Sequence, residues 1–220
     1  MSITVTFEDI KANPEVRAYI EKGNEHLGVL GYTEHGLRHA ALVSQQAGRI
    51  LSHIQADPRK VELACIAGFM HDIGNAVSRD SHAQIGALLA RSILREMGMD
   101  FGEIAEVIAA IGNHDESVGQ VINIPAAALI LADKCDVHFK RVRNKEHASF
   151  DIHDRVNYAV RESSVNLEGR NITLELKTDL QISPLIDYFE IFLPRMVMCR
   201  RAASFLDCQF HLIINGARFL

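Results

Sequence analysis

The sequence predicts a mainly helical protein: a helical bundle with a small C-terminal α+β extension that contains an antiparallel hairpin and a helix. The chain has 220 residues, of which 48% are hydrophobic and 23% are charged, so it can bury a sizeable core. Apolar residues recur at helical spacing up to about residue 144, and beyond it apolar and polar residues alternate as in strands. We therefore place the helical domain at residues 1–147 and the extension, packed on it, at residues 148–220.

The charge and the cysteines exclude several classes of protein. A formal net charge of -5 argues against a nucleic-acid polymer or an anionic membrane as a partner. No secretory leader begins the chain, and no apolar run reaches membrane-spanning length. The 4 cysteines are scattered without a CxxC pair, which fits reduced thiols better than a disulfide framework or a zinc ribbon. We therefore expect a cytoplasmic protein.

The first helices are indicated by their starting residues. Asn13-Pro14 predicts a helix from residue 14 to about residue 29, because proline is favoured in the first helical turn. Thr33 can cap the next helix, which should run through His35 and His39 to about residue 53. His39 continues the apolar stripe that this helix turns toward the core.

The stretch from Ala64 to Gly74 organises the rest of the chain. A nearly unbroken apolar run predicts a buried helix, and His71 and Asp72 follow it directly. We expect Gly74 just past the helix end, in the left-handed conformation that stops a helix. A His-Asp pair at this position is hard to solvate, so either other polar groups pair with it or a metal neutralises it.

Three further helices carry histidine or aspartate. They are expected at about residues 81–97, 100–112 and 124–139. The first opens with Ser-His-Ala-Gln, which has the form of a capping box. This arrangement places His82 at a helix start, His114 just after a helix end, and Asp133 in the middle of an apolar helix.

The extension is predicted from a different pattern. A short helix is expected at about residues 151–160, a hairpin at residues 165–177, a helix from residue 184, and a final strand at residues 209–215. Pro194 lies inside the last helix and should kink it or split it in two.

Six residues thus stand at helix ends or on inner faces: His39, His71, Asp72, His82, His114 and Asp133. Four imidazoles and two carboxylates suit two divalent first-row metal ions, bridged by a carboxylate and a hydroxide. A hydroxide held between two cations is a nucleophile near neutral pH, and the cations would offset phosphoryl charge. Spacing alone does not prove that the six residues converge.

At these residues the chain resembles the HD-domain superfamily of metal-dependent phosphohydrolases. The resemblance rests on the order of the six residues and on the local sequences Met-His-Asp-Ile-Gly, Asn-His-Asp-Glu and Ala-Asp-Lys around His71, His114 and Asp133. It implies that His39, His71, Asp72 and Asp133 hold one metal, and that His82 and His114 hold a second, with Asp72 bridging the two.

Departures from one branch of the superfamily narrow the expected activity. Asn75 stands where the cyclic-dinucleotide phosphodiesterases usually have lysine, Asp115 stands where they have a second histidine, and their Gly-Tyr-Pro signature is absent. Cleavage of cyclic dinucleotides is therefore disfavoured. His35 occupies the place where some relatives have a carboxylate that binds a third metal. One interpretation of His35 is therefore a third-metal ligand, and the alternative is a histidine that supports another ligand or faces solvent.

Basic residues near the expected centre are candidates for binding substrate. Asp72, Lys134 and Arg79 are predicted to be catalytic. Lys140, Arg141 and Arg143 are predicted to bind substrate through its phosphates, and His35 is also predicted to bind substrate. The basic run from Lys140 to Lys145 is interpreted as a phosphate-binding site, and the alternative is a solvated surface with no ligand.

We therefore expect a phosphohydrolase that cleaves a phosphoester or phosphoanhydride of a small phosphorylated metabolite, in particular a nucleotide, with a metal-bridged hydroxide. The two ions would be Fe, Mn, Co, Ni or Zn. A di-iron oxygenase of the same fold and a non-catalytic nucleotide-sensing regulator are the alternatives. The expected partners are the small substrate, with no nucleic-acid polymer and no membrane, and a homodimer is left open by the exposed hairpin.

Overall fold

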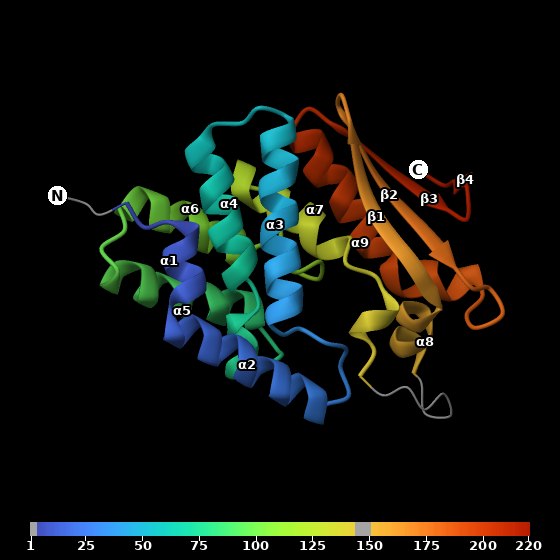
Figure 1. The fold of residues 1–220 in the computed structure, drawn as a ribbon, viewed down its shortest axis with the longest axis horizontal. Helices are drawn as coiled ribbons and strands as arrows, with labels where there is room; N and C mark the ends of the chain where they lie inside the picture. The colour runs from blue at the N-terminus through green and yellow to red at the C-terminus, as the bar shows by residue number, and fades with distance from the viewer. Residues whose placement is uncertain (1–3, 144–150) are drawn as a thin grey trace.

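The computed structural model describes residues 4–143 and 151–220 and confirms a mainly helical protein with a small C-terminal α+β part (Figure 1). The predicted domain boundary near residue 147 lies outside the described residues, so the division into two domains stays a prediction. The helical elements before this boundary are α1 (Phe7–Ala12), α2 (Pro14–Val29), α3 (Leu37–His53), α4 (Pro58–Met70), η1 (Ile73–Ala76), α5 (His82–Glu96), α6 (Phe101–Gly112), α7 (Ile124–Lys134) and η2 (Phe139–Arg141). After it come α8 (Ile152–Ala159), β1 (Val160–Glu168), β2 (Asn171–Thr178), α9 (Leu185–Phe205), β3 (Gln209–Ile214) and β4 (Ala217–Arg218).

Side-chain caps fix several helix starts. The side chains of Asn13, Asp57, Asp100 and Asn123 accept hydrogen bonds from the first free backbone N–H groups of α2, α4, α6 and α7. Helix α1, which we did not predict, begins with a reciprocal capping box between Thr6 and Asp9. Because its six residues form less than two turns, α1 gives only a weak periodic signal.

Two predicted helix starts are wrong. Helix α3 begins after Gly36, not after Thr33, and has no side-chain cap. The Thr33 carbonyl instead accepts a hydrogen bond from the His35 ring at 2.7 Å, so this segment forms a loop. Ser81 precedes α5 with a left-handed φ of 59° and makes no capping bond, so the expected capping box with Gln84 is absent.

Two predicted helix ends also differ from the structure. Helix α7 ends at Lys134 rather than near residue 139, so Lys140, Arg141 and Arg143 do not lie on the helix that carries Asp133. Gly74 lies in η1 and is not left-handed. Its physical role is close packing, because the start of α5 leaves no space for a side chain there.

Helix α7 lies at the centre of the molecule. Every residue from Pro125 to Lys134 is buried. The helix packs against α3, α4 and α6 on the side of the bundle and against α9 of the C-terminal part (Figure 1). One hydrophobic core therefore continues from the helical bundle into the C-terminal part.

The C-terminal sheet has the strand order β1-β2-β3-β4. The predicted hairpin is confirmed as the antiparallel pair β1 and β2. Strand β3 lies parallel to β2, with Leu174 opposite Leu212, because α9 carries the chain back as a crossover between them. Pro194 lies inside α9, which continues as one helix of 21 residues. In the described part of the chain, no helix is long and apolar enough to cross a membrane.

Candidate metal centre

The structure brings the six predicted ligands into one cluster. His39 lies in α3, His71 and Asp72 follow α4, and His82 is the first residue of α5. His114 follows α6, and Asp133 lies in the last turn of α7. All six are buried, with Asp72 and Asp133 keeping the largest exposure, 8% each. Five segments that are distant in sequence thus converge on one point.

One half of the cluster contains His39, His71 and Asp133. The His39 and His71 Nε2 atoms are 3.3 Å apart. Asp133 Oδ1 lies 3.2 Å from His39 Nε2 and 3.7 Å from His71 Nε2. Asp72 Oδ2 completes this half, 3.2 Å from His71 Nε2 and 3.8 Å from His39 Nε2.

The other half contains His82 and His114. Their Nε2 atoms are 3.2 Å apart. The second oxygen of Asp72, Oδ1, lies 3.5 Å from His82 Nε2 and 3.9 Å from His114 Nε2. Asp72 therefore presents one oxygen to each half, which is the arrangement of a bridging carboxylate.

The donor spacing fits divalent metal ions. Ligand atoms held about 2.0–2.1 Å from one ion at tetrahedral or octahedral angles lie about 2.8–3.4 Å from each other. The Nε2–Nε2 separations of 3.3 Å and 3.2 Å fall in this range. Imidazole with carboxylate suits Mn, Fe, Co, Ni or Zn. The described residues include three overlapping sets of this kind: His39-His71-Asp72, His71-His114-Asp133 and Asp72-His82-His114.

The Nδ1 atom of each histidine has an acceptor that sets the tautomer. The acceptors are Asp136 Oδ2 at 2.7 Å for His39, the Gly68 carbonyl at 2.8 Å for His71, the Arg79 carbonyl at 3.1 Å for His82, and the Ile111 carbonyl at 2.6 Å for His114. Carbonyl and carboxylate oxygens only accept, so each Nδ1 donates and each Nε2 presents a lone pair to the centre.

Asp136 is a functional residue that the sequence analysis missed. It is buried, and its Oδ2 also accepts a hydrogen bond from Arg38 Nη2 at 3.0 Å. Burial alone would raise the pKa of Asp136, but the Arg141 guanidinium and the His39 hydrogen bond hold this pKa well below its usual range. The only available signal was a second aspartate three residues after Asp133, which reads equally well as a surface residue.

The surroundings lower the pKa of both carboxylates of the cluster and the pKa of two of its histidines, His82 and His114. Burial would raise the pKa of Asp72, but His71 and its hydrogen bond lower it well below the usual range. Burial would likewise raise the pKa of Asp133, but the charge of Lys134 and the hydrogen bond from His39 lower this pKa well below the usual range. Burial, reinforced by His71 and Lys134, lowers the pKa of His114 to about 3. Deprotonated carboxylates and neutral imidazoles are the forms that bind metals.

A chain of ion pairs leads from the cluster to the C-terminal part. Lys134 Nζ lies 2.7 Å from Asp133 Oδ2 and 2.6 Å from Glu116 Oε2. Glu116 Oε1 in turn accepts from Arg195 Nε at 2.7 Å, and Arg195 belongs to α9. Sequence analysis did not single out Glu116 or Arg195, because nothing in the local pattern indicates that α9 reaches the centre.

A cleft of about 440 Å³ lies beside this chain of ion pairs. Its lining includes His35, Arg79, Glu116, Arg141 and Arg195. A neighbouring cleft shares Arg79 and reaches His82. The second cleft thus reaches the half of the cluster that contains His82.

The predicted substrate residues occupy different places. His35, Arg79 and Arg141 line the cleft beside the cluster, and Arg141 also donates to the Glu34 and Asp136 carbonyls. Arg143 instead donates to the Tyr32 carbonyl at 2.9 Å and to Asn24, and Lys140 lines a separate pocket. The structure therefore does not bring Arg143 or Lys140 to the cluster. Lys145 lies outside the described residues. All of these roles stay predictions.

Comparisons with known proteins agree with the geometry. Residues 34–138 match a family model described as HD domain. An uncharacterised protein of Methanocaldococcus jannaschii is 26% identical over 159 residues, which cover 62% of this chain and 61% of that protein. Ribonuclease Y of Lawsonia intracellularis is 35% identical over 107 residues, which cover 47% of this chain and 18% of the ribonuclease.

Two further proteins are similar to part of the chain. Ribonuclease Y of Thermus thermophilus is 32% identical over 130 residues, which cover 48% of this chain and 21% of the ribonuclease. A crystal structure of a predicted HD superfamily hydrolase from an uncultured Thermotogales bacterium shares 27% identity, covers 60% of this chain and 73% of that chain, and gives a TM-score of 0.45. The chain thus spans 61% of the archaeal relative and about a fifth of the ribonucleases.

Proposed function

We propose that this chain, whose residues 34–138 match the HD-domain family model, is a metal-dependent phosphohydrolase that cleaves a small phosphorylated metabolite of the nucleotide class. The observation that carries the proposal is the arginine-lined cleft beside the His/Asp cluster. Arg79, Arg141 and Arg195 come from three separate segments and meet in this lining. Guanidinium groups bind phosphate oxygens in bidentate pairs, so the cleft suits a phosphoryl group next to the cluster.

The residues present suit two resident divalent ions. His39, His71, Asp72 and Asp133 would hold one ion, and Asp72, His82 and His114 would hold the other. When bound, such ions lower the pKa of water and offset the charge of phosphoryl oxygens.

The side chains around the cluster position its carboxylates. Asn75 donates to Asp72 Oδ1 at 2.9 Å, which fixes the plane of the bridging carboxylate. Lys134 holds Asp133 Oδ2 and so turns Oδ1 toward His39 and His71. Both contacts preorganise the centre before substrate arrives.

Arg195 and Arg79 are the residues we assign to the phosphoryl group. Arg195 uses its Nε to bond Glu116, which anchors the guanidinium at the cleft. Arg79 makes a long contact to Asn75, 3.4 Å from Nη1 to Oδ1, and stacks on Tyr32 with 5.3 Å between its Cζ and the ring centroid. The exposed Tyr32 ring offers a stacking surface for a base, which supports a nucleotide as the substrate class.

His35 supplies a neutral hydrogen-bonding group to the same cleft. Its Nδ1 donates to the Thr33 carbonyl at 2.7 Å, so Nε2 is an acceptor. Burial, reinforced by Arg141, lowers the pKa of His35 well below its ordinary value. A neutral Nε2 can accept a proton or a hydrogen bond from water or from a substrate hydroxyl.

The names of the ribonuclease Y proteins describe RNA cleavage in those proteins. Two observations favour a small substrate here. The cleft has a volume of only about 440 Å³, and the chain carries a formal net charge of -5. A strongly acidic balance disfavours wrapping a polyanion.

The test uses the full chain loaded separately with Mn, Fe, Co, Ni or Zn. A panel of nucleoside mono-, di- and triphosphates, sugar phosphates and a short RNA is assayed for phosphate or nucleotide release. We expect metal-dependent turnover of at least one small phosphate compound and slow or no cleavage of RNA. Strict iron dependence with oxygen uptake and no phosphate release would identify a di-iron oxygenase instead.

A matched pair of variants tests the role of the cleft. Arg195→Ala should lower kcat/KM at least about tenfold, because a charged hydrogen bond to phosphate is lost. Arg200→Ala removes an exposed arginine from the same helix and should leave kcat/KM unchanged. Equal effects of the two substitutions would refute the assignment of Arg195.

A further inference from the structure

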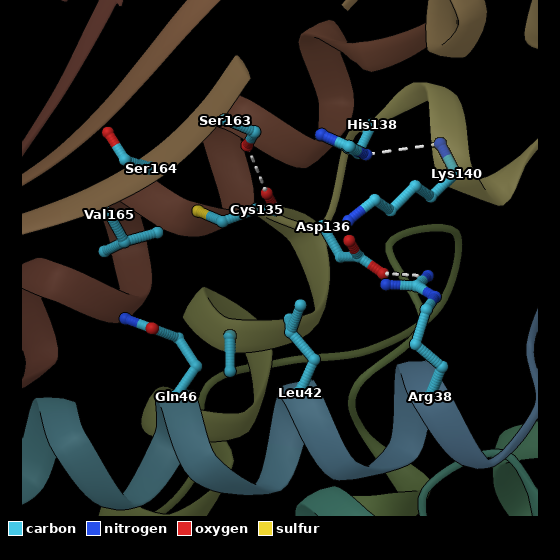
Figure 2. Close-up of a pocket in the computed structure, with 11 residues that line it drawn as sticks. Arg38, Leu42, Gln46, Cys135, Asp136, His138, Lys140, Ser163, Ser164 and Val165 are labelled. Carbon is cyan, nitrogen blue, oxygen red and sulfur yellow. Dashed lines mark hydrogen bonds and ion pairs between the residues drawn. The ribbon is translucent and has the colours of Figure 1, made fainter. Parts of the chain in front are cut away.

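Asp136, which accepts the hydrogen bond from His39, also lines a second pocket. The pocket has a volume of about 340 Å³, within the range of small-molecule sites. Figure 2 shows its three walls: α3, the end of α7 with the segment after it, and β1. Among the described residues, none that lines this pocket lines the cleft beside the cluster, and none is a predicted metal ligand. The two cavities are therefore separate.

The wall from α3 presents three side chains one helical turn apart. Arg38, Leu42 and Gln46 point from the same face of the helix into the pocket (Figure 2). Arg38 bonds Glu34 through Nε at 2.7 Å and Asp136 through Nη2 at 3.0 Å. Within the described residues, its Nη1 takes part in neither contact and is available to a ligand.

Gln46 has a buried donor without a partner. Its Nε2 is inaccessible to solvent and makes no hydrogen bond with the described residues. The amide lies at the end of the pocket below Val165 (Figure 2). A buried amide N–H without an acceptor costs free energy, and an acceptor brought by a ligand would remove that cost.

The charge of the pocket favours an anion. The carboxylates of Glu34 and Asp136 are matched by the guanidinium groups of Arg38 and Arg141. The Lys140 side chain extends across the pocket toward Asp136 (Figure 2). No carboxylate of the described residues lies within ion-pair distance of Lys140, so its charge is the uncompensated one at this site.

Much of the remaining lining is apolar or hydrogen-bonded within the protein. Leu42, Ala132 and Val165 contribute hydrocarbon surface. The Ser163 hydroxyl donates to the Cys135 carbonyl at 3.4 Å. A ligand that fits this lining has a charged head and an apolar body.

We propose that this pocket is a second small-molecule site, which binds a small organic anion. The carboxylate or phosphate head lies between Arg38 and Lys140, the apolar body packs on Leu42 and Val165, and an acceptor atom reaches Gln46. This assignment goes beyond the proposed hydrolase function and does not depend on it.

The test measures binding by calorimetry to the full, metal-loaded chain. The probes are benzoate, phenyl phosphate and inorganic phosphate, which separate the two head groups and the contribution of an apolar body. We expect benzoate or phenyl phosphate to bind at least about tenfold more tightly than inorganic phosphate, because only they bury apolar surface.

Substitutions on α3 locate the binding. Gln46→Glu places a like charge beside the anion and should weaken probe binding at least about tenfold. Gln45→Glu makes the same charge change at the exposed neighbouring position and should have no effect. Lys140→Ala alters an exposed side chain and should weaken probe binding several-fold. This variant provides the test if the Gln46→Glu protein does not fold.

Arg195→Ala separates this pocket from the cleft beside the cluster. It should leave the binding of benzoate unchanged, because benzoate has no phosphoryl group and Arg195 lines only that cleft among the cavities described. The proposal is overturned if no apolar probe binds. It is also overturned if binding responds to Arg195→Ala but not to Gln46→Glu or Lys140→Ala.

Discussion

The backbone carbonyl oxygen of His82 lies 2.0 Å from the position that a Cβ atom on Gly74 would occupy. The amide nitrogen of Gly86 lies 2.6 Å from the same position. Only glycine therefore allows the start of α5, which carries His82, to contact the segment after His71-Asp72. The glycine of this motif joins the two halves of the cluster by close backbone packing.

Gly74→Ala should destabilise the protein by about 2 kcal/mol or more, because backbone atoms on both sides must move. Urea unfolding of the two proteins measures the difference. Gly112→Ala is the control, since its Cβ would meet only the Ala87 side chain at 3.6 Å. A Gly74→Ala protein as stable as the Gly112→Ala protein would contradict the packing argument.

Substitutions in the cluster should separate the two ions. Asp72→Asn removes the charge shared by both halves, so we expect both ions to be lost. His82→Ala removes a ligand from one half only, and we expect one ion to remain. Elemental analysis after gel filtration gives the metal content per chain. Loss of a single ion from Asp72→Asn would show that this carboxylate does not bridge.

Asp136→Asn should weaken the ion held by His39, because the His39 Nδ1–H loses its charged acceptor at 2.7 Å. Loss of such a support typically costs about 10- to 100-fold in metal affinity. Competition with a chelator measures the affinity. Glu34→Gln is the control, since Glu34 also bonds Arg38 but does not touch His39. A similar loss of affinity in both variants would assign the effect to Arg38.

Acid should release the two ions in sequence. In the metal-free protein burial lowers the pKa of His71, but Asp72 and Asp133 more than offset this effect and raise it above 6.5. The pKa of His114 is lowered to about 3, and that of His82 is also lowered. Protons therefore compete first at His71, and its ion should be lost first as the pH falls from about 8 to about 5.

Metal content after dialysis at stepped pH checks this order, and earlier loss of the ion at His82 and His114 would contradict it.

The raised pKa of His71 has a second consequence for the metal-free protein. The protonated ring contributes stability that is fully present below pH 6.5 and is lost as the pH rises through the folded-state pKa. Urea unfolding of metal-free protein against pH measures this contribution.

The local sequence predicted helix starts and strands correctly where interactions between residues close in sequence determine them. Asn13 and Asp100 cap helices where expected, and the alternation around Leu174 places β2 correctly. The same local rules failed at Thr33, whose carbonyl accepts from the His35 ring and from Arg143 of a distant segment. They failed at Ser81 as well, which has a left-handed φ and caps nothing. They also failed at the end of α7, where the chain leaves the helix at Cys135.

The sequence by itself determined the helical class and the six residues that stand at helix ends, since periodicity and residue chemistry are properties of short segments. Only the tertiary structure decided that these residues converge, that Asp136 supports His39, and that Arg195 reaches the cleft from α9. Apart from the adjacent pair His71 and Asp72, each of these contacts joins residues separated by 10 or more positions in the chain. Such contacts depend on how helices pack around α7, and packing is set by the whole core.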